Sequence, residues 1–177
     1  MGTLTCLCQN PTYLPGLSAN EFLLLPREVA RSMSEMVDER ALTDKDFVTM
    51  CNIEAQTVKR CSHCGRLYIY YFDEEGETDE ALKAVDSFPL RDEAEALCAC
   101  RNADRSAMLL VPSGALMDFA DAMIRGMVTG REVGAFFSER ASEALQCEDC
   151  GRLLLRNAEK QTVTIYELDN VSDWDND

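Results

Sequence analysis

The sequence predicts an α+β protein built from two tandem duplicated zinc-knuckle modules. In each module, short β-strands and a two-helix segment are expected to be stapled by four cysteines. Three observations predict this class: a Cys-x-x-Cys-Gly-Arg-Leu string that occurs twice, a Cys-x-Cys pair that occurs twice, and a gapless match between the segments before the two strings. The strings lie at residues 61–67 and 147–153, and the pairs are Cys6/Cys8 and Cys98/Cys100.

The duplication extends well beyond the cysteines. A shift of 86 residues places Leu23-Leu24-Leu25-Pro26 on Leu109-Leu110-Val111-Pro112. From each proline to the first cysteine of its string there are 35 steps, so this stretch aligns without a gap. The Cys-x-Cys pairs differ by 92 positions because six more residues precede Leu23 in the first copy.

Two helices are expected after each proline. Apolar residues recur at helical spacing in the first helix of each copy, at Val29, Met33, Met36, Val37 and Ala41, and at Leu116, Phe119, Met123 and Met127. A second helix is predicted to end directly at the knuckle, with Phe47, Cys51, Ala55 and Val58 in one copy and Val133, Phe137, Ala141 and Leu145 in the other. Before this second helix, Thr129-x-x-Glu132 forms a full capping-box pattern and Thr43-x-x-Asp46 a near match. Pro26 suits the first turn of the first helix in its copy.

Strands are predicted on both sides of the helices. Residues 67–72 are β-branched and aromatic, and residues 153–155 and 162–168 are similar. The Cys-x-Cys pairs and the segments 23–25 and 109–111 are expected to be short strands too. We therefore expect module 1 at 1–72, an acidic linker at 73–91 with a short helix at 80–85, and module 2 with an acidic tail at 92–177.

Each set of four cysteines is predicted to hold a structural zinc ion. Cys-x-x-Cys on a tight turn directs two sulfurs to one spot, and Cys-x-Cys in an extended segment directs two more to one face. The following glycine can adopt a left-handed conformation that lets backbone N–H groups approach the sulfurs. The knuckle resembles those of zinc-ribbon and treble-clef proteins over about seven residues per copy, which implies a metal-stabilised fold. The expected ligands are Cys6, Cys8, Cys61 and Cys64, and Cys98, Cys100, Cys147 and Cys150.

Several alternatives to this assignment stay open. Thiolates alone do not choose between zinc and iron, and the sets can also be grouped across the copies, with Cys61 and Cys64 meeting Cys98 and Cys100. Thioredoxin-like redox chemistry is disfavoured because each knuckle is expected to follow a helix, and disulfides because the chain starts without a signal peptide. His63 is expected to be an exposed turn residue, and Cys51 a buried small apolar side chain.

Charge is the second strong feature of the chain. It has 32 acidic and 17 basic residues and a formal net charge of −15, which makes direct nucleic-acid binding unlikely and favours a basic protein partner. No apolar run is long enough to span a membrane, and we expect a cytoplasmic protein. Solvation of the surface is the simpler reading of the acidic runs.

The sequence does not predict an active site. One histidine cannot supply the usual nucleophilic triads, no phosphate-binding glycine loop is present, and sets of four cysteines leave a metal no open position. Arg66 and Arg152 follow the knuckles, where a charge partner to the thiolates or to a nearby carboxylate is the expected role.

We therefore expect a non-enzymatic zinc protein that binds another protein, one form being an immunity or antitoxin-type inhibitor of a basic toxin domain. The alternative is a transcription-linked or nucleic-acid-linked zinc-ribbon-like regulator. The expected partner contacts are acidic residues and one aromatic: Asp73, Glu74, Glu75, Glu77, Asp79, Glu80, Asp169, Asp173, Trp174 and Asp175.

Overall fold

A computed structural model of the chain describes residues 4–6, 8–9, 11–12, 20–38, 43–73, 76–89, 100, 105–128 and 130–169. The first half contains β3 (Glu21–Pro26), α1 (Arg27–Asp38), α2 (Asp44–Glu54), β4 (Gln56–Arg60), β5 (Leu67–Asp73) and β6 (Gly76–Pro89). The second half repeats this order as β7 (Arg105–Pro112), α3 (Ser113–Ile124), α4 (Gly130–Arg140), β8 (Ser142–Cys147), β9 (Leu153–Asn157) and β10 (Thr162–Leu168). Before them, β1 (Leu4–Thr5) and β2 (Pro11–Thr12) pair as a separate small hairpin.

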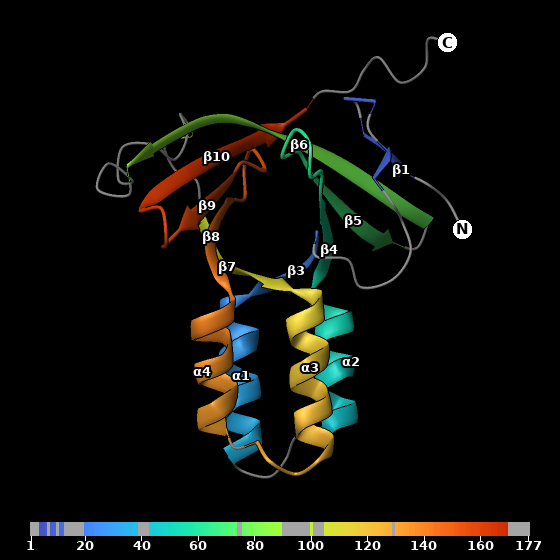
Figure 1. Cartoon of the computed structure of the whole chain (residues 1–177), viewed down its shortest axis with the longest axis vertical. Helices are drawn as coiled ribbons and strands as arrows, with labels where there is room; N and C mark the ends of the chain where they lie inside the picture. Colours follow the sequence, from blue (N-terminus) through green and yellow to red (C-terminus); the bar gives the residue numbers. More distant parts are fainter. Residues whose placement is uncertain are drawn as a thin grey trace.

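The dominant feature is a closed antiparallel barrel of eight strands in the order β10-β6-β5-β4-β3-β7-β8-β9. Each half contributes a meander of four neighbouring strands. The helices extend from one end of this barrel as a bundle, with α1 beside α4 and α2 beside α3 (Figure 1). Closure removes the exposed strand edges that an open sheet would present.

The two halves meet at two junctions, and both are centred on residues that lie 86 positions apart. At the first junction, β3 pairs with β7 and Leu24 lies opposite Leu110. At the second, β6 pairs with β10 and Leu82 lies opposite Leu168. A residue that pairs with its own counterpart marks the axis of a two-fold rotation in an antiparallel ladder. The register therefore relates the two halves by an approximate two-fold axis through both leucine pairs.

The two largest apolar cores lie on the two faces of the strands. The barrel interior takes buried side chains from all eight strands, among them Leu24, Leu67, Leu110 and Leu153. Neighbouring strand residues point to opposite faces, so Leu25 leaves the interior and joins the core formed with the helices.

In the helical core, equivalent positions of the two halves carry side chains of different size. Phe47 is fully buried where the second half has Val133, and Phe137 is buried where the first half has Cys51. The rings of Phe47 and Phe137 lie 6.5 Å apart, and that of Phe119 lies 5.7 Å from Phe47. The larger side chain of one half thus fills space that the smaller one leaves.

The structure confirms the two-helix segments and corrects their ends. A strand, β4 or β8, separates each second helix from its knuckle, so the expectation that the helix ends at the knuckle is wrong. Pro26 is the last residue of β3 and not part of a first helical turn. Thr43 and Asp46 form a complete capping box, which exceeds the predicted near match, while Thr129 lies outside the described residues.

Two further expectations differ from the structure. Residues 80–85 belong to the long strand β6, not to a helix, because this segment pairs with β5 on one side and with β10 on the other. Cys6 and Cys8 lie in the turn region after β1 and not in a strand; the amide of Gln9 donates to the carbonyl of Cys6 at 2.7 Å. The predicted domain boundaries stay a prediction. Among the helices described, none is both long and apolar enough for a membrane crossing.

Candidate metal centres

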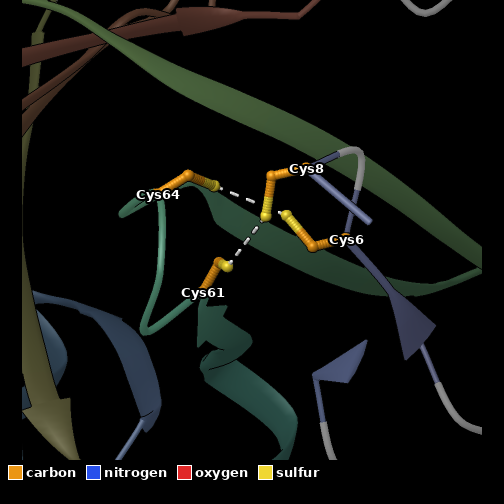
Figure 2. Close-up of side chains that lie close together, drawn as sticks. All are labelled: Cys6, Cys8, Cys61 and Cys64. Carbon is orange, nitrogen blue, oxygen red and sulfur yellow. Dashed lines mark hydrogen bonds between the residues drawn. The ribbon is translucent and has the colours of Figure 1, made fainter. Parts of the chain in front are cut away.

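Four cysteines from two separate turns meet at the outer surface of the barrel. Cys61 and Cys64 lie in the turn that joins β4 to β5, and Cys6 and Cys8 approach them from the N-terminal hairpin (Figure 2). All four sulfur atoms lie within 4.8 Å of one another. The structure therefore groups this set within one half, as predicted, and not across the halves.

The sulfur spacing fits a tetrahedral thiolate site. The Sγ atoms of Cys6 and Cys64 are 3.5 Å apart, and those of Cys8 and Cys61 are 3.7 Å apart. Zinc–thiolate bonds of about 2.3 Å separate the sulfurs of a regular tetrahedron by about 3.8 Å. A disulfide would require about 2.05 Å. None of these four cysteines forms a disulfide in the described structure, so their arrangement suits a shared ion rather than a covalent pair.

The knuckle turn has the same backbone geometry in both halves. The amide of Gly65 donates to the carbonyl of Cys61 at 2.9 Å, and the amide of Gly151 donates to that of Cys147 at 2.9 Å. Gly65 has a φ of 75° and Gly151 a φ of 68°, the left-handed conformation expected from the sequence. Each turn joins two strands that pair with each other, β4 with β5 and β8 with β9, so each knuckle is the tip of a β-hairpin.

Polar groups around the first cluster act on its sulfurs. Burial raises the pKa of Cys6 to about 12, although the Tyr68 hydroxyl, 3.1 Å from its Sγ, opposes this rise. Burial also acts to raise the pKa of Cys61, but hydrogen bonds from the backbones of Cys64 and His63 outweigh it, and the net pKa is lowered. Backbone N–H groups thus favour the thiolate form at the knuckle, where a metal ligand must be deprotonated.

Arg66 links the first cluster to the end of β10. Its Nε donates to Asp169 Oδ2 at 2.8 Å, and its Nη1 lies 3.9 Å from the Sγ of Cys64. Lys83 of β6 contacts the other carboxylate oxygen of Asp169 at 3.0 Å. Burial acts to raise the pKa of Asp169, but Lys83 and Arg66 together lower it. The predicted role of Arg66 as a charge partner of a thiolate and a carboxylate is confirmed.

The second cluster repeats the first in its described part. Cys100, Cys147 and Cys150 bring their sulfurs within 4.8 Å of one another, while Cys98 lies outside the described residues. Arg152, the counterpart of Arg66, forms an ion pair with Glu167 of β10. Each cluster is thus accompanied by an arginine paired with a carboxylate from the same region of β10.

The remaining predicted residues fall into three groups. Cys51 is buried among the helices, 4.0 Å from the sulfur of Met33, and His63 is exposed, as expected for both. Asp73, Glu77, Asp79 and Glu80 lie at the facing ends of β5 and β6, and Asp169 is largely buried in its ion pairs. The partner contacts Glu74, Glu75, Asp173, Trp174 and Asp175 lie outside the described residues. Tyr68 and Lys83 also act near the first cluster but were not predicted, because the spacing of the cysteines gives no sign of them.

Comparison with known proteins adds no assignment, because no family model, no curated protein and no solved structure matches this chain.

Proposed function

We propose that the protein holds two structural zinc ions, one in each half. The observation that carries this is the closed set of Cys6, Cys8, Cys61 and Cys64, whose four sulfurs account for every position of a tetrahedral ion. The second ion is assigned to Cys100, Cys147 and Cys150, with Cys98 as its fourth ligand. We assign zinc rather than iron because structural zinc sites are usually tetrahedral with thiolate ligands, and because zinc has no redox chemistry, which suits a purely structural role.

Metal content tests this assignment directly. Protein purified without chelator should contain close to two zinc ions per chain by elemental analysis. Cys61→Ser should lower this to about one, while Cys51→Ser, which changes a buried cysteine outside both clusters, should leave it unchanged. Metal-free protein, or iron in place of zinc, would contradict the assignment.

The zinc ions are proposed to hold the fold for a non-enzymatic, protein-binding role, with an immunity or antitoxin-type inhibitor of a basic toxin domain as its most concrete form. A net charge of −15 would attract a basic partner and speed its association. The acidic run 73–80 supports this reading. Its described part, Asp73 and residues 76–80, lies where β5 and β6 pair, with Asp73 opposite Gly76. The side chain of Asp169 is only 14% exposed, so we no longer count it among the partner contacts. Its proposed role is to hold Arg66 beside the first cluster.

Affinity purification of the tagged protein from its source cell tests the role. A single basic, toxin-like partner whose capture weakens with added salt is expected. Glu75→Lys/Glu77→Lys should reduce its capture, while Asp118→Lys/Asp121→Lys, the same charge change on exposed positions of α3, should not.

Recovery of polymerase or ribosome components would instead support the alternative, a transcription-linked zinc regulator. The knuckle hairpins favour that reading. The charges near them do not, because Arg66 is paired with Asp169 and Lys59 lies over the ring of Tyr70, 4.9 Å from its centroid.

A further inference from the structure

A groove of about 940 Å³ lies between α1 of the first half and α4, β8 and β9 of the second half. Its volume is in the range that small-molecule sites occupy, about 300–1,000 Å³. Leu109 and Phe137 line it and are 7% and 5% exposed, and Ala30 and Ala141 add further apolar lining. The groove therefore extends from the surface to the helical core, and its floor is apolar.

Four arginines line this groove: Arg27, Arg31, Arg140 and Arg156. Glu143 lies between two of them, since its Oε1 is 3.5 Å from Nη1 of Arg27 and its Oε2 bonds to Arg156. One carboxylate thereby holds two guanidinium groups close together. Glu139 and Glu159 are the other acidic lining residues, and Glu35, beside the lining, lies 3.8 Å from Arg31. Four guanidinium groups thus face four carboxylates, so the groove lacks the excess of negative charge that the chain has as a whole, −15.

The equivalent place on the other side of the two-fold axis provides an internal comparison. The positions 86 residues away from the four arginines are Ser113, Met117, Glu54 and Tyr70, and none of them is basic. The two halves share their strands, helices and knuckles, so the fold itself does not require these arginines. Their gathering at only one of the two equivalent places, among the described residues, points to a property of this groove rather than to a need of the barrel.

We propose that the groove binds a small organic anion, in which a carboxylate or phosphate group is joined to an apolar portion. Guanidinium groups donate paired hydrogen bonds to carboxylate or phosphate oxygens, which matches the cluster around Glu143. The apolar portion lies against Leu109 and Phe137. Arg140 and Arg31, the latter 3.8 Å from Glu35, are the further guanidinium groups that line the groove. This site is independent of the metal centres and of the acidic hairpin proposed for a protein partner.

Amide chemical-shift titration of the full-length, zinc-loaded protein tests the proposal. The probes are phenyl phosphate and benzoate, which share an aromatic ring and differ in the anion, with benzyl alcohol as the neutral control. Both anions, or one of them, should shift the amides of Ala30, Ser34 and Ser142 in a saturable manner. The stronger of the two identifies the anionic group of the ligand.

A variant inside the groove and a matched control outside it test charge recognition. Arg31→Met installs the residue of the other half at an exposed side chain and should weaken anion binding about tenfold, the loss expected for one charged hydrogen bond. Arg125→Met makes the same change outside the groove and should leave binding unaltered. The proposal is overturned if neither anion shifts these amides at millimolar concentration. It is equally overturned if benzyl alcohol binds as well as the anions, or if Arg31→Met binds the anions as tightly as the parent protein does.

Discussion

Replacement of Arg66 by methionine should weaken both the first metal centre and the closure of the barrel. The guanidinium joins the Sγ of Cys64 to the carboxylate of Asp169, and thus connects the knuckle of the first half to the last strand of the second. Methionine retains much of the apolar side-chain length but removes the charge and the hydrogen-bond donors. Arg125→Met is the matched control, since Arg125 is exposed at the end of α3.

The expected loss follows from the burial of the pair. The side chains of Arg66 and Asp169 are 25% and 14% exposed, so this ion pair is partly buried. An exposed ion pair contributes under about 1 kcal/mol to stability, and breaking a buried one costs about 3–5 kcal/mol. Lys83 remains 3.0 Å from the carboxylate and limits the loss, so we expect about 1–2 kcal/mol. The arginine lowers the pKa of Asp169, so its contribution is present above about pH 3.9 and fades as the pH falls further. Measurement at pH 7 therefore captures all of it.

Urea unfolding at pH 7 and competition for zinc with a chelator of known affinity give the two readouts. Arg66→Met should lower the unfolding free energy by the amount above and weaken zinc binding at one of two sites about 10-fold to 100-fold, as for other groups that orient metal ligands. If Arg66→Met behaves like Arg125→Met in both assays, the link between the cluster and β10 carries no energy and the reasoning fails.

Three further predictions concern the metal and the packing. Chelation should speed amide exchange at Gln9 but not in β10, because the N-terminal hairpin shares no ladder with the barrel; equal exchange in both would show that the barrel itself needs the ion. Phe47→Ala should cost about 3–5 kcal/mol in thermal or urea unfolding without loss of zinc, since its fully buried ring packs only in the helical core; a change in zinc content would contradict this separation. Gly65→Ala should destabilise by about 1–2 kcal/mol because its φ is 75°, whereas Gly114→Ala, in a helix with open space around the position, should stabilise slightly; similar effects of both would refute the strain argument.

The cysteine clusters were largely predictable because the spacing of the cysteines along the chain is a local signal. Cysteine pairs at a tight turn and two residues apart can converge whatever the surrounding topology. The within-half grouping of Cys6, Cys8, Cys61 and Cys64 followed from treating one copy as a unit. The groups that act on the sulfurs from a distance were not predictable in this way. Lys83 reaches Asp169 only because β6 and β10 pair, and that pairing joins residues 86 apart.

The errors in the fold have local physical causes. Apolar residues continue at helical spacing past the end of α2, at Phe47, Cys51, Ala55 and Val58. The start of β4 at Gln56 therefore could not be recognised from this pattern. The segment of β6 is rich in acidic residues and has low strand propensity, which pairing on both sides overrides. A signal was nonetheless present, because shifting the predicted strand 162–168 by 86 residues falls on 76–82, the first part of β6.

The pairing of Leu24 with Leu110 and of Leu82 with Leu168 bears on how the two halves can differ. Two separate copies of one half, related by a true two-fold axis, would satisfy both junctions with the same strand contacts. In such an assembly every substitution would occur twice, and an arginine placed at one groove would stand at the other as well. Covalent continuity removes that constraint. One chain can carry Arg31 on one side and Met117 on the other, and so can keep a common scaffold while giving each face its own chemistry.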